Sequence, residues 1–569
     1  MEGRDELTNT AAAEKSDQGP FIFLAFDEAA NLFKSDSDVR YAALRRVLRL
    51  LNEFPIWSLF LSTKSRIESL DPPAKVDPSA RIRNQRLSTI SPFIGIELDV
   101  EASRRLSHPD LCSKELVKPL SHFATADHMS MFGRPLWLVY ARGSYESIQG
   151  MARYKLLCGQ DVYKVSNKHH VFAATASRLC LDPCMNNEEA TKLAREAVNS
   201  HLRVVVGIDS SSGWMTTVTP SEPIVVDAVA EILMTEDNWR PTVYTLAQDL
   251  LSKGLIEKGL KGELFSRLLL ILARDVLLAN KDPAPEFRFS QHFPLSQFLD
   301  ALYGDHDRSH IKNHHEIKRI SSSPTFASAL MNFSHFTRTD QSLTRDTIRD
   351  LLHNLMRQQA ALQLCPNQKH WDLLIPIYFG EPTAPFLPSA LSAVFVQVKN
   401  RQRATHLDIK ESDYGELFGT SDASRNPVLC LYLDLESTPT DRERVEVSQN
   451  EGQPWVFGIY SRGAKSTMFS CLNKISGMED ACREFFRAVG PRKAPEEEDI
   501  CSHNLAFRYH GWLERFPQMH EVPEEQAEAV SDETVISCDR EKGKGNRGRR
   551  TVQVLSGYPD GTGIRGLPS

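Results

Sequence analysis

The sequence predicts a multidomain α/β protein, because segments with strand-like and helix-like hydrophobic periodicity alternate along most of its 569 residues. Hydrophobic residues make up 41% of the chain, which is enough to build several cores. Helical periodicity dominates the middle of the chain, and strand-like runs follow one another in its C-terminal half. We therefore expect a disordered N-terminus at 1–20, an α/β region at 21–145, a helical middle domain at 146–340, a second α/β domain at 343–490 and a mostly disordered tail at 491–569.

The charge balance and the cysteines narrow the classes of function. The chain has 67 Lys and Arg against 74 Asp and Glu residues, a net charge of -7, so any nucleic-acid-binding surface has to be local. Of the ten cysteines only Cys180 and Cys184 lie close together, which argues against a disulfide framework and for a reducing compartment. The N-terminus lacks an apolar signal core, and no apolar run approaches the length of a membrane helix. We expect an intracellular protein without membrane association, in the cytoplasm or the nucleus.

The first α/β region begins with the apolar run FIFLAF, which ends in Asp27 and Glu28. The runs YAALRRVLRLL and IWSLFLST follow with helical and strand-like spacing, so this order predicts a parallel sheet. An acidic pair at the carboxyl end of a buried strand lies where parallel sheets bind ligands. Asp27 would hold Mg²⁺ there, and Glu28 would orient an attacking water. The structural alternative is a strand that turns into a helix, with Asp27 as the N-cap.

This region resembles the Walker B part of P-loop ATPases, in which an apolar strand ends in an acidic pair. The next strand ends in Ser62 and Thr63, where ATPases of the signalling and AAA+ kinds place a γ-phosphate sensor. The text FGRPLW offers Arg134 as an arginine sensor. The resemblance implies nucleotide contacts from Asp27, Thr63 and Arg134 and a catalytic role for Glu28.

The phosphate-binding loop G-x-x-x-x-G-K-(S/T) of such ATPases does not precede the Walker B-like strand. Two partial matches occur later, GLIEKGLKG from Gly254 and GIYSRGAKST from Gly458, and an extra residue displaces the lysine in each. Most phosphate contacts come from this loop, so we expect this polypeptide alone to bind ATP poorly. Either the chain is an incomplete product, or its ATPase fold has decayed to a scaffold.

A second constellation lies in the C-terminal α/β region. In the run SAVFVQVKN, Gln397 and Lys399 share one strand face with Phe395. Asp372 opens the preceding strand, WDLLIPIYF, and a hairpin through EPTAPFLPSA would bring it near the pair. Oxygen ligands from Asp372 and Gln397 suit Mg²⁺ or Mn²⁺, and Lys399 would position a water and stabilise charge on a scissile phosphate. The structural alternative is a Lys–Asp pair at a sheet edge.

This arrangement resembles the restriction-endonuclease-like superfamily, PD-(D/E)xK, in the branch that reads Q-x-K. The resemblance implies Asp372 and Gln397 as metal ligands and Lys399 as the catalytic lysine. Two departures are visible in the sequence. Trp371 stands in place of the proline of the motif, and the helix ahead carries two glutamines, at 358 and 359, where many members place an acidic ligand.

Together, the two constellations resemble the NTPase–nuclease proteins of the Crinkler and retrotransposon-hot-spot type. Uncharacterised fungal relatives of that type carry text similar to FGRPLW at 132–137, RLCLDP at 178–183, SEPI at 221–224, GELFSRLLL at 262–270 and VQVKNR at 396–401. The resemblance covers most of residues 21 to about 490 and implies a fold and a domain order.

Three functions remain open at the level of sequence. The leading hypothesis is a metal-dependent nuclease that acts on DNA with Mg²⁺, attached to a truncated or degenerate ATPase. It predicts phosphate contacts from Lys369, Arg401 and Arg403. The second is a catalytically inactive effector that keeps the fold and binds protein partners. The third is a fragment of a P-loop ATPase whose Walker A sequence lies upstream.

Overall fold

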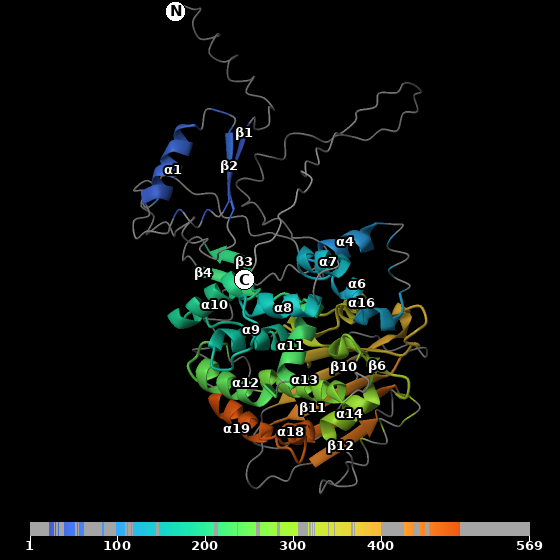
Figure 1. The fold of residues 1–569 in the computed structure, drawn as a ribbon. Helices are drawn as coiled ribbons and strands as arrows, with labels where there is room; N and C mark the ends of the chain where they lie inside the picture. Colours follow the sequence, from blue (N-terminus) through green and yellow to red (C-terminus); the bar gives the residue numbers. More distant parts are fainter. Residues whose placement is uncertain are drawn as a thin grey trace, which may run out of the picture. The chain divides into compact units, whose positions relative to one another are not determined.

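The structure is a computed structural model of mixed α/β architecture (Figure 1). Among the residues that it describes, no helix is long and apolar enough to cross a membrane. Isolated positions aside, the described residues are 22–27, 39–51, 56–61, 98–108, 118–143, 147–209, 214–235, 237–257, 262–280, 285–304, 325–339, 341–345, 347–365, 370–399, 426–435, 444–449 and 455–489. The segments expected to be disordered, 1–20 and 491–569, lie outside them.

The N-terminal described segment consists of β1 (Ile22–Phe26), α1 (Val39–Leu50) and β2 (Ile56–Phe60). β1 pairs with β2 in parallel, so the parallel sheet predicted from the sequence is confirmed. The rings of Phe26 and Phe60 stack with their centroids 4.8 Å apart, and Tyr41 of α1 meets the Phe60 ring edge-on at 5.5 Å. These contacts hold the helix against the strand pair.

Short helices precede the helical region that the sequence predicted. They are α4 (Val100–Ser107), η3 (Leu120–Ala124), α6 (Ala126–Met129) and α7 (Pro135–Arg142). The helical region contains α8 (Ile148–Leu156), α9 (Lys168–Leu179), α10 (Glu188–Ser200), α11 (Pro223–Thr235), α12 (Trp239–Thr245), the π-helical turn η4 (Leu246–Leu251) and α13 (Glu263–Ala279). Asn167 and Asn187 cap α9 and α10, because their side-chain oxygens accept backbone N–H groups of the first turn. Helices make up most of the described residues from 148 to 279, but strands at 204–218 and 293–338 also lie within the predicted helical region of 146–340.

One helix in this region ends earlier than the sequence predicted. The run ATKLAREAVNSHLRVVV at 190–206 lies within the predicted helical region, but α10 ends at Ser200 and Leu202 has a φ of 61°. The run then forms β3 (Val204–Asp209), which pairs with β4 (Trp214–Val218) in a hairpin. Three consecutive β-branched valines favour a strand, and a left-handed residue ahead of them breaks the helix.

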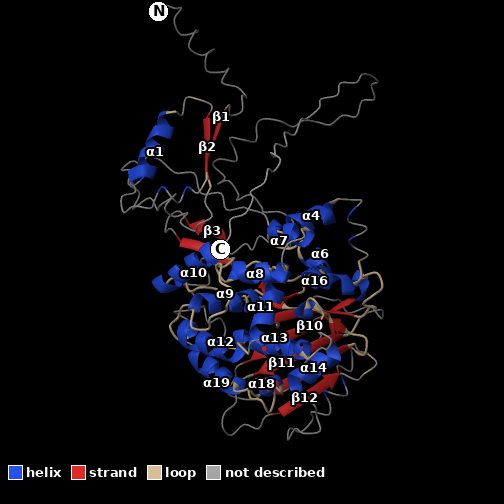
Figure 2. Ribbon diagram, viewed as in Figure 1, coloured by secondary structure: helices blue, strands red, loops and turns tan. Residues whose placement is uncertain are grey.

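The C-terminal half forms a nine-stranded mixed sheet (Figure 2). Its strands are β5 (Phe293–Pro294), β6 (Leu330–Met331), β7 (His335–Arg338), β8 (Ala360–Gln363), β9 (Leu373–Tyr378), β10 (Leu391–Lys399), β11 (Val428–Asp434), β12 (Arg444–Gln449) and β13 (Val456–Arg462). The order is β12-β13-β11-β10-β9-β6-β5, with β8 beside β9 and β7 beside β8. β10, β11 and β13 are parallel, whereas β9 is antiparallel to β8 and β10. The strands expected from the runs between 371 and 462 are all present.

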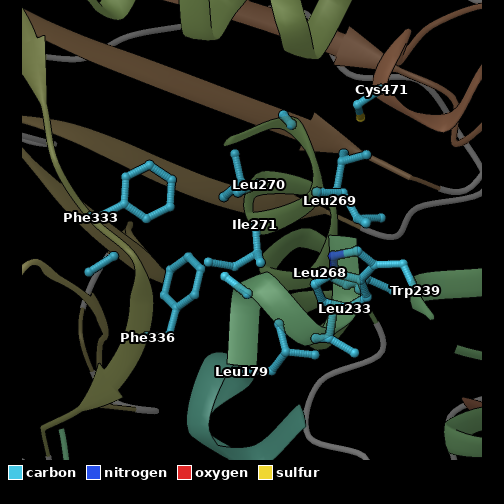
Figure 3. Packing of buried hydrophobic residues seen from close by; sticks show 14 of the residues in the cluster. Leu179, Leu233, Trp239, Leu268, Leu269, Leu270, Ile271, Phe333, Phe336 and Cys471 are labelled. Atoms are coloured by element: carbon cyan, nitrogen blue, oxygen red, sulfur yellow. The ribbon is translucent and has the colours of Figure 1, made fainter. Parts of the chain in front are cut away.

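Helices cover both faces of this sheet. η5 (Arg288–Ser290), α14 (Leu295–Tyr303), η7 (Pro388–Ala390), α16 (Ile348–Gln358), α18 (Cys471–Lys474) and α19 (Met478–Val489) complete the described elements. On one face, α13 shares a large core with Val394 and Val396 of β10. On the other face, α16 packs against Phe395 of β10 and Tyr432 of β11. Figure 3 shows how Leu268 to Ile271 of α13 meet side chains of α9, α11 and α12 and the phenylalanines at 333 and 336.

A charged group lies inside the larger core. Arg178 of α9 and Arg274 of α13 both donate to Asp275 Oδ1, at 2.7 and 2.6 Å, and all three side chains are fully buried. We call Arg178 and Arg274 the buried arginine pair. His335 hydrogen-bonds Ser221 Oγ through Nε2 at 2.7 Å, and its burial and the charges of the buried arginine pair lower its pKa to about 3. A protonated imidazole is therefore excluded from this core near neutral pH.

Candidate functional site

The hairpin predicted for the second constellation is present. β9 and β10 are antiparallel, and Leu373 lies opposite Val396, which places Asp372 opposite Gln397. The Asp372 amide donates to the Val396 carbonyl at 2.9 Å, and the Val398 amide donates to Asp372 Oδ2 at 2.6 Å. The aspartate is thus fixed against the end of β10 by backbone hydrogen bonds on both sides.

Lys399, the last residue of β10, acts electrostatically on Asp372. The pKa of Asp372 is raised to about 6, because the effect of burial outweighs the lowering effects of the Val398 amide hydrogen bond and the positive charge of Lys399. Asp372 and Lys399 are both half-buried. The carboxylate and the ammonium group therefore act on each other where β9 begins and β10 ends.

A second carboxylate, Glu263, joins this group from outside the hairpin. Burial and, to a smaller extent, the negative charge of Asp372 raise the pKa of Glu263 to about 7, against the lowering effects of Arg267 and Gln363. Glu263 is the first residue of α13. An ionised Asp372 therefore opposes ionisation of Glu263, because like charges that lie close together repel.

Gly262 explains how the start of α13 comes so close to β10. Its φ is 124°, which L side chains rarely adopt, and a Cβ atom there would lie 2.9 Å from Val398 Cγ1 and 3.5 Å from Leu435 Cδ1. Glycine therefore permits both the backbone conformation and the close approach. The helix that begins at Glu263 starts against the strand residue that precedes Lys399.

Neighbouring polar groups hold Glu263 in place. Gln363 of β8 donates from Nε2 to Glu263 Oε2 at 3.3 Å, and Arg267 Nη1 donates to Gln363 Oε1 at 2.7 Å. The same nitrogen donates to the carbonyl oxygens of Leu179 and Cys180 at the end of α9, at 2.5 and 3.1 Å. Three stretches that carry the family resemblance, RLCLDP, GELFSRLLL and VQVKNR, therefore meet around one site.

β11 contributes a buried ion pair beside Lys399. In the parallel register Lys399 lies opposite Asp434. Asp434 Oδ2 accepts hydrogen bonds from Arg462 Nη1 and, at 2.8 Å, from Tyr460 Oη, and the charged pair is almost fully buried. Asp434 is therefore held in an ion pair with Arg462, whereas burial raises the pKa values of Asp372 and Glu263.

Two glutamines stand at the C-terminal end of α16. At the end of α16, Gln358 Nε2 donates to Asp99 Oδ2 at 3.4 Å, and Gln359 Nε2 donates to the Phe123 carbonyl at 2.6 Å. Both glutamines are buried. They bind the segment of short helices before α8, so the extra carboxylate of the site comes from α13.

The oxygen-bearing side chains near the end of β10 are of types that could contact a hard divalent cation. Asp372, Glu263 and the amide oxygen of Gln397 are the ligand types that Mg²⁺ and Mn²⁺ prefer. Within the described segments, no group of three or more His, Cys, Asp or Glu side chains is arranged to hold a metal ion. The fit rests on two carboxylates whose charges repel, a repulsion that a divalent cation would remove.

The residues of the first constellation are only partly described. Asp27 follows β1 in a turn and is exposed, whereas Glu28 and Thr63 lie outside the described residues. The Arg134 side chain donates to Glu222 Oε2 and, at 2.6 Å, to the Leu202 carbonyl. Lys369, Arg401 and Arg403, the residues expected to contact phosphates, also lie outside the described residues.

The text FGRPLW has a packing role in the described structure. Besides the contact of Arg134, Trp137 Nε1 donates to Glu222 Oε1 at 2.8 Å. Gly133 has a φ of 82°, and a Cβ atom there would collide with the Glu222 side chain. The stretches FGRPLW and SEPI are therefore joined through Glu222.

Comparison with known proteins gives one match. Residues 172–444 match the model of a family described as "Domain of unknown function (DUF8736)". This range contains Glu263, Gln363, Asp372, Gln397 and Lys399. No curated protein and no solved structure matches the chain.

Proposed function

We propose that the site at the ends of β9 and β10 is the centre of a metal-dependent nuclease that acts on DNA. The observation that carries this proposal is the placement of three side chains. Asp372 accepts the Val398 amide hydrogen bond next to Lys399, and Glu263 directly follows Gly262, whose Cβ position lies 2.9 Å from Val398 Cγ1. Phosphodiester hydrolysis needs such a combination, because anionic ligands hold the cation and a positive side chain stabilises the charge that grows on the phosphate.

Each residue has a defined task in this proposal. Asp372 and Glu263 would hold Mg²⁺, and the Gln397 amide oxygen would approach it from the strand face that carries Lys399. When bound, the ion would supply positive charge beside the phosphate and a water of lowered pKa. Lys399 donates hydrogen bonds to a phosphate oxygen and to the attacking water. The Val398 amide keeps Asp372 oriented through its hydrogen bond at 2.6 Å.

The sheet supports the resemblance to endonuclease-like proteins of the Q-x-K type. The aspartate stands before the outgoing strand of an antiparallel hairpin, and Gln397 and Lys399 end the returning strand. The acid from α13 offsets the glutamines that stand at the C-terminal end of α16. For the N-terminal segment we propose a remnant of a P-loop ATPase, supported by the parallel pairing of β1 with β2 and by Asp27 at the end of β1.

A catalytically inactive effector is the second candidate. It is favoured by the small ligand set, since only two carboxylates among the described residues reach the proposed metal site. In that case the same residues would form a structural polar group at the sheet edge. The two candidates differ in one measurable property, the binding of a divalent cation.

The test measures cation binding and DNA cleavage on the same preparations. Wild-type protein is titrated with Mn²⁺ and then incubated with labelled single- and double-stranded DNA in Mg²⁺, Mn²⁺ or EDTA. Asp372→Asn, Glu263→Gln and Lys399→Met are compared with Asp249→Asn, a matched change at an exposed residue that pairs with Lys253. Folding of each variant is confirmed by circular dichroism.

We expect metal-dependent cleavage that is lost in Asp372→Asn and Lys399→Met and kept in Asp249→Asn. Mn²⁺ affinity should fall in Asp372→Asn and Glu263→Gln but hold in Lys399→Met. Equal Mn²⁺ affinity in wild type and both carboxylate variants would contradict the metal site. Folded wild-type protein that cleaves no DNA with any metal would leave the inactive effector as the function.

A further inference from the structure

The side chain of Lys399 lies over an aromatic ring of the neighbouring strand. β10 and β11 are parallel, and their register places Gln397 opposite Tyr432 and Lys399 opposite Asp434. Lys399 Nζ is 5.7 Å from the centroid of the Tyr432 ring. This separation falls within the range of cation–π attraction, which strengthens where the contact is shielded from water.

The ring beneath the ammonium group is fixed on several sides. Tyr432 is 5% exposed, so it cannot turn away into solvent. Its centroid lies 5.6 Å from that of Trp371, which in turn lies 5.2 Å from Phe395. The Tyr432 carbonyl accepts a hydrogen bond from Ser461 Oγ at 3.4 Å, which ties this part of β11 to β13. A rigid ring defines where a flexible lysine side chain ends.

The surrounding charges favour the same placement. Lys399 lowers the pKa of Asp372, so its ammonium group acts on the carboxylate of the hairpin. The carboxylate on the other side, Asp434, is bound by Arg462 and Tyr460. The ammonium group therefore lies over the Tyr432 ring and within reach of the field of Asp372.

We propose that Tyr432 is a positioning residue for Lys399. The face of the Tyr432 ring fixes the ammonium group of Lys399 beside Asp372. The inference rests on the proposed nuclease function for its kinetic consequence, whereas the geometry of the contact is independent of it. A four-carbon lysine side chain has several rotatable bonds, and a fixed ring beneath it restricts the conformers that it samples. Tyr432 would thus limit the loss of conformational entropy when Lys399 binds a phosphate.

The direct test is a ring-current measurement. Protein labelled with ¹³C at the lysine ε carbon should show one resonance shifted upfield, and its loss in Lys399→Arg would assign it. Tyr432→Phe should keep the shift, because the ring remains. Tyr432→Leu should remove it. Phe395→Leu is the matched control, since it removes a buried ring of the same cluster that does not lie under Lys399.

The kinetic test uses the same variants on DNA. Tyr432→Leu should lower kcat about tenfold with KM unchanged, and Tyr432→Phe should stay within about twofold of wild type. An upfield shift that survives in Tyr432→Leu would overturn the proposal, as would an equal loss of kcat in Phe395→Leu. Absence of DNA cleavage by the wild-type protein would refute the nuclease function. The ring-current shift would still show whether the Lys399 ammonium group lies over the Tyr432 ring, because that measurement does not depend on cleavage.

Discussion

Replacing Gly262 by alanine perturbs the close approach of the start of α13 to Val398 of β10. Gly262 has a φ of 124°, and an added Cβ atom would lie 2.9 Å from Val398 Cγ1. Gly254 provides the matched control, because it also has a positive φ, 67°, but no atom lies within 4 Å of an added Cβ. The two variants share the chemical change and differ in what the new methyl group meets.

The expected costs follow from these geometries. At Gly254 an alanine has only to adopt a left-handed conformation, which costs ~1–2 kcal/mol. At Gly262 the conformation is rarer and costs ~1–3 kcal/mol, and the forced contact with Val398 adds ~1–3 kcal/mol. The free energy of unfolding should therefore fall by about 4 kcal/mol in Gly262→Ala, more than twice the loss in Gly254→Ala.

Two assays separate stability from site geometry. Urea denaturation followed by circular dichroism gives the free energy of unfolding of each variant. Mn²⁺ titration reports the site, because relief of the contact moves Glu263 away from Asp372. Displacement of a ligand by changes in its supporting residues typically weakens metal affinity about 10- to 100-fold, and we expect a loss in this range for Gly262→Ala alone.

Two results would refute this reasoning. Equal destabilisation of the two glycine variants would show that the start of α13 does not press against β10. Unchanged Mn²⁺ affinity in a destabilised Gly262→Ala protein would show that Glu263 is not a metal ligand, whatever the role of Asp372.

Three further predictions concern charges. Asp372→Asn should lower the pKa of Glu263 from about 7 toward its ordinary value, because the substitution removes a negative charge that opposes ionisation of Glu263. ¹³C NMR titration of the Glu263 carboxyl measures this pKa, and an unchanged value would contradict the prediction. The pKa of His335 is lowered to about 3. As the pH falls, His335 therefore takes up a proton in the unfolded chain before it does so in the folded protein. The contribution of His335 to the free energy of unfolding is full above about pH 6.5 and falls below that pH, by ~2 kcal/mol at pH 5. Urea midpoints at both pH values should show a smaller difference in His335→Gln than in wild type, and an equal difference would contradict the assignment. Asp275→Asn leaves the buried arginine pair uncompensated and should cost ~3–5 kcal/mol in thermal unfolding, against at most ~1 kcal/mol for Asp249→Asn at the surface; similar losses in both would show that the pair is not buried.

The hairpin of the site was predictable because the sequence features that specify it lie within one short stretch of the chain. Alternating and continuous apolar runs mark β9 and β10, and a turn-rich stretch between them fixes their antiparallel return. Gln397 and Lys399 then share a face by the two-residue period of a strand. The position of Asp372 follows from the same pairing, without any contact distant in sequence.

Glu263 could not be found in this way. Its helix is apolar on nearly every side, a pattern that indicates burial without saying against which strand. The one local signal is a glycine directly before an acidic helix start, within a stretch that also carries the family resemblance. Only the packing of α13 on the sheet turns that signal into a site residue. The strand β3 was missed for a related reason, since helical periodicity was extended through a run of valines.

The source of the second carboxylate has a consequence for how the site depends on the rest of the fold. α16 and α13 pack on opposite faces of the sheet. Gln358 and Gln359, at the end of α16, hydrogen-bond to Asp99 and Phe123 in the segment of short helices before α8. Mutations in that segment should therefore act through α16 on the sheet face that carries Lys399. Glu263 depends instead on Gln363 and on Arg267, which also holds the end of α9. The affinity for a metal ion and the placement of Lys399 should therefore respond to mutations in different parts of the chain. Asp372 couples the two faces of the sheet, because it interacts electrostatically with both Lys399 and Glu263.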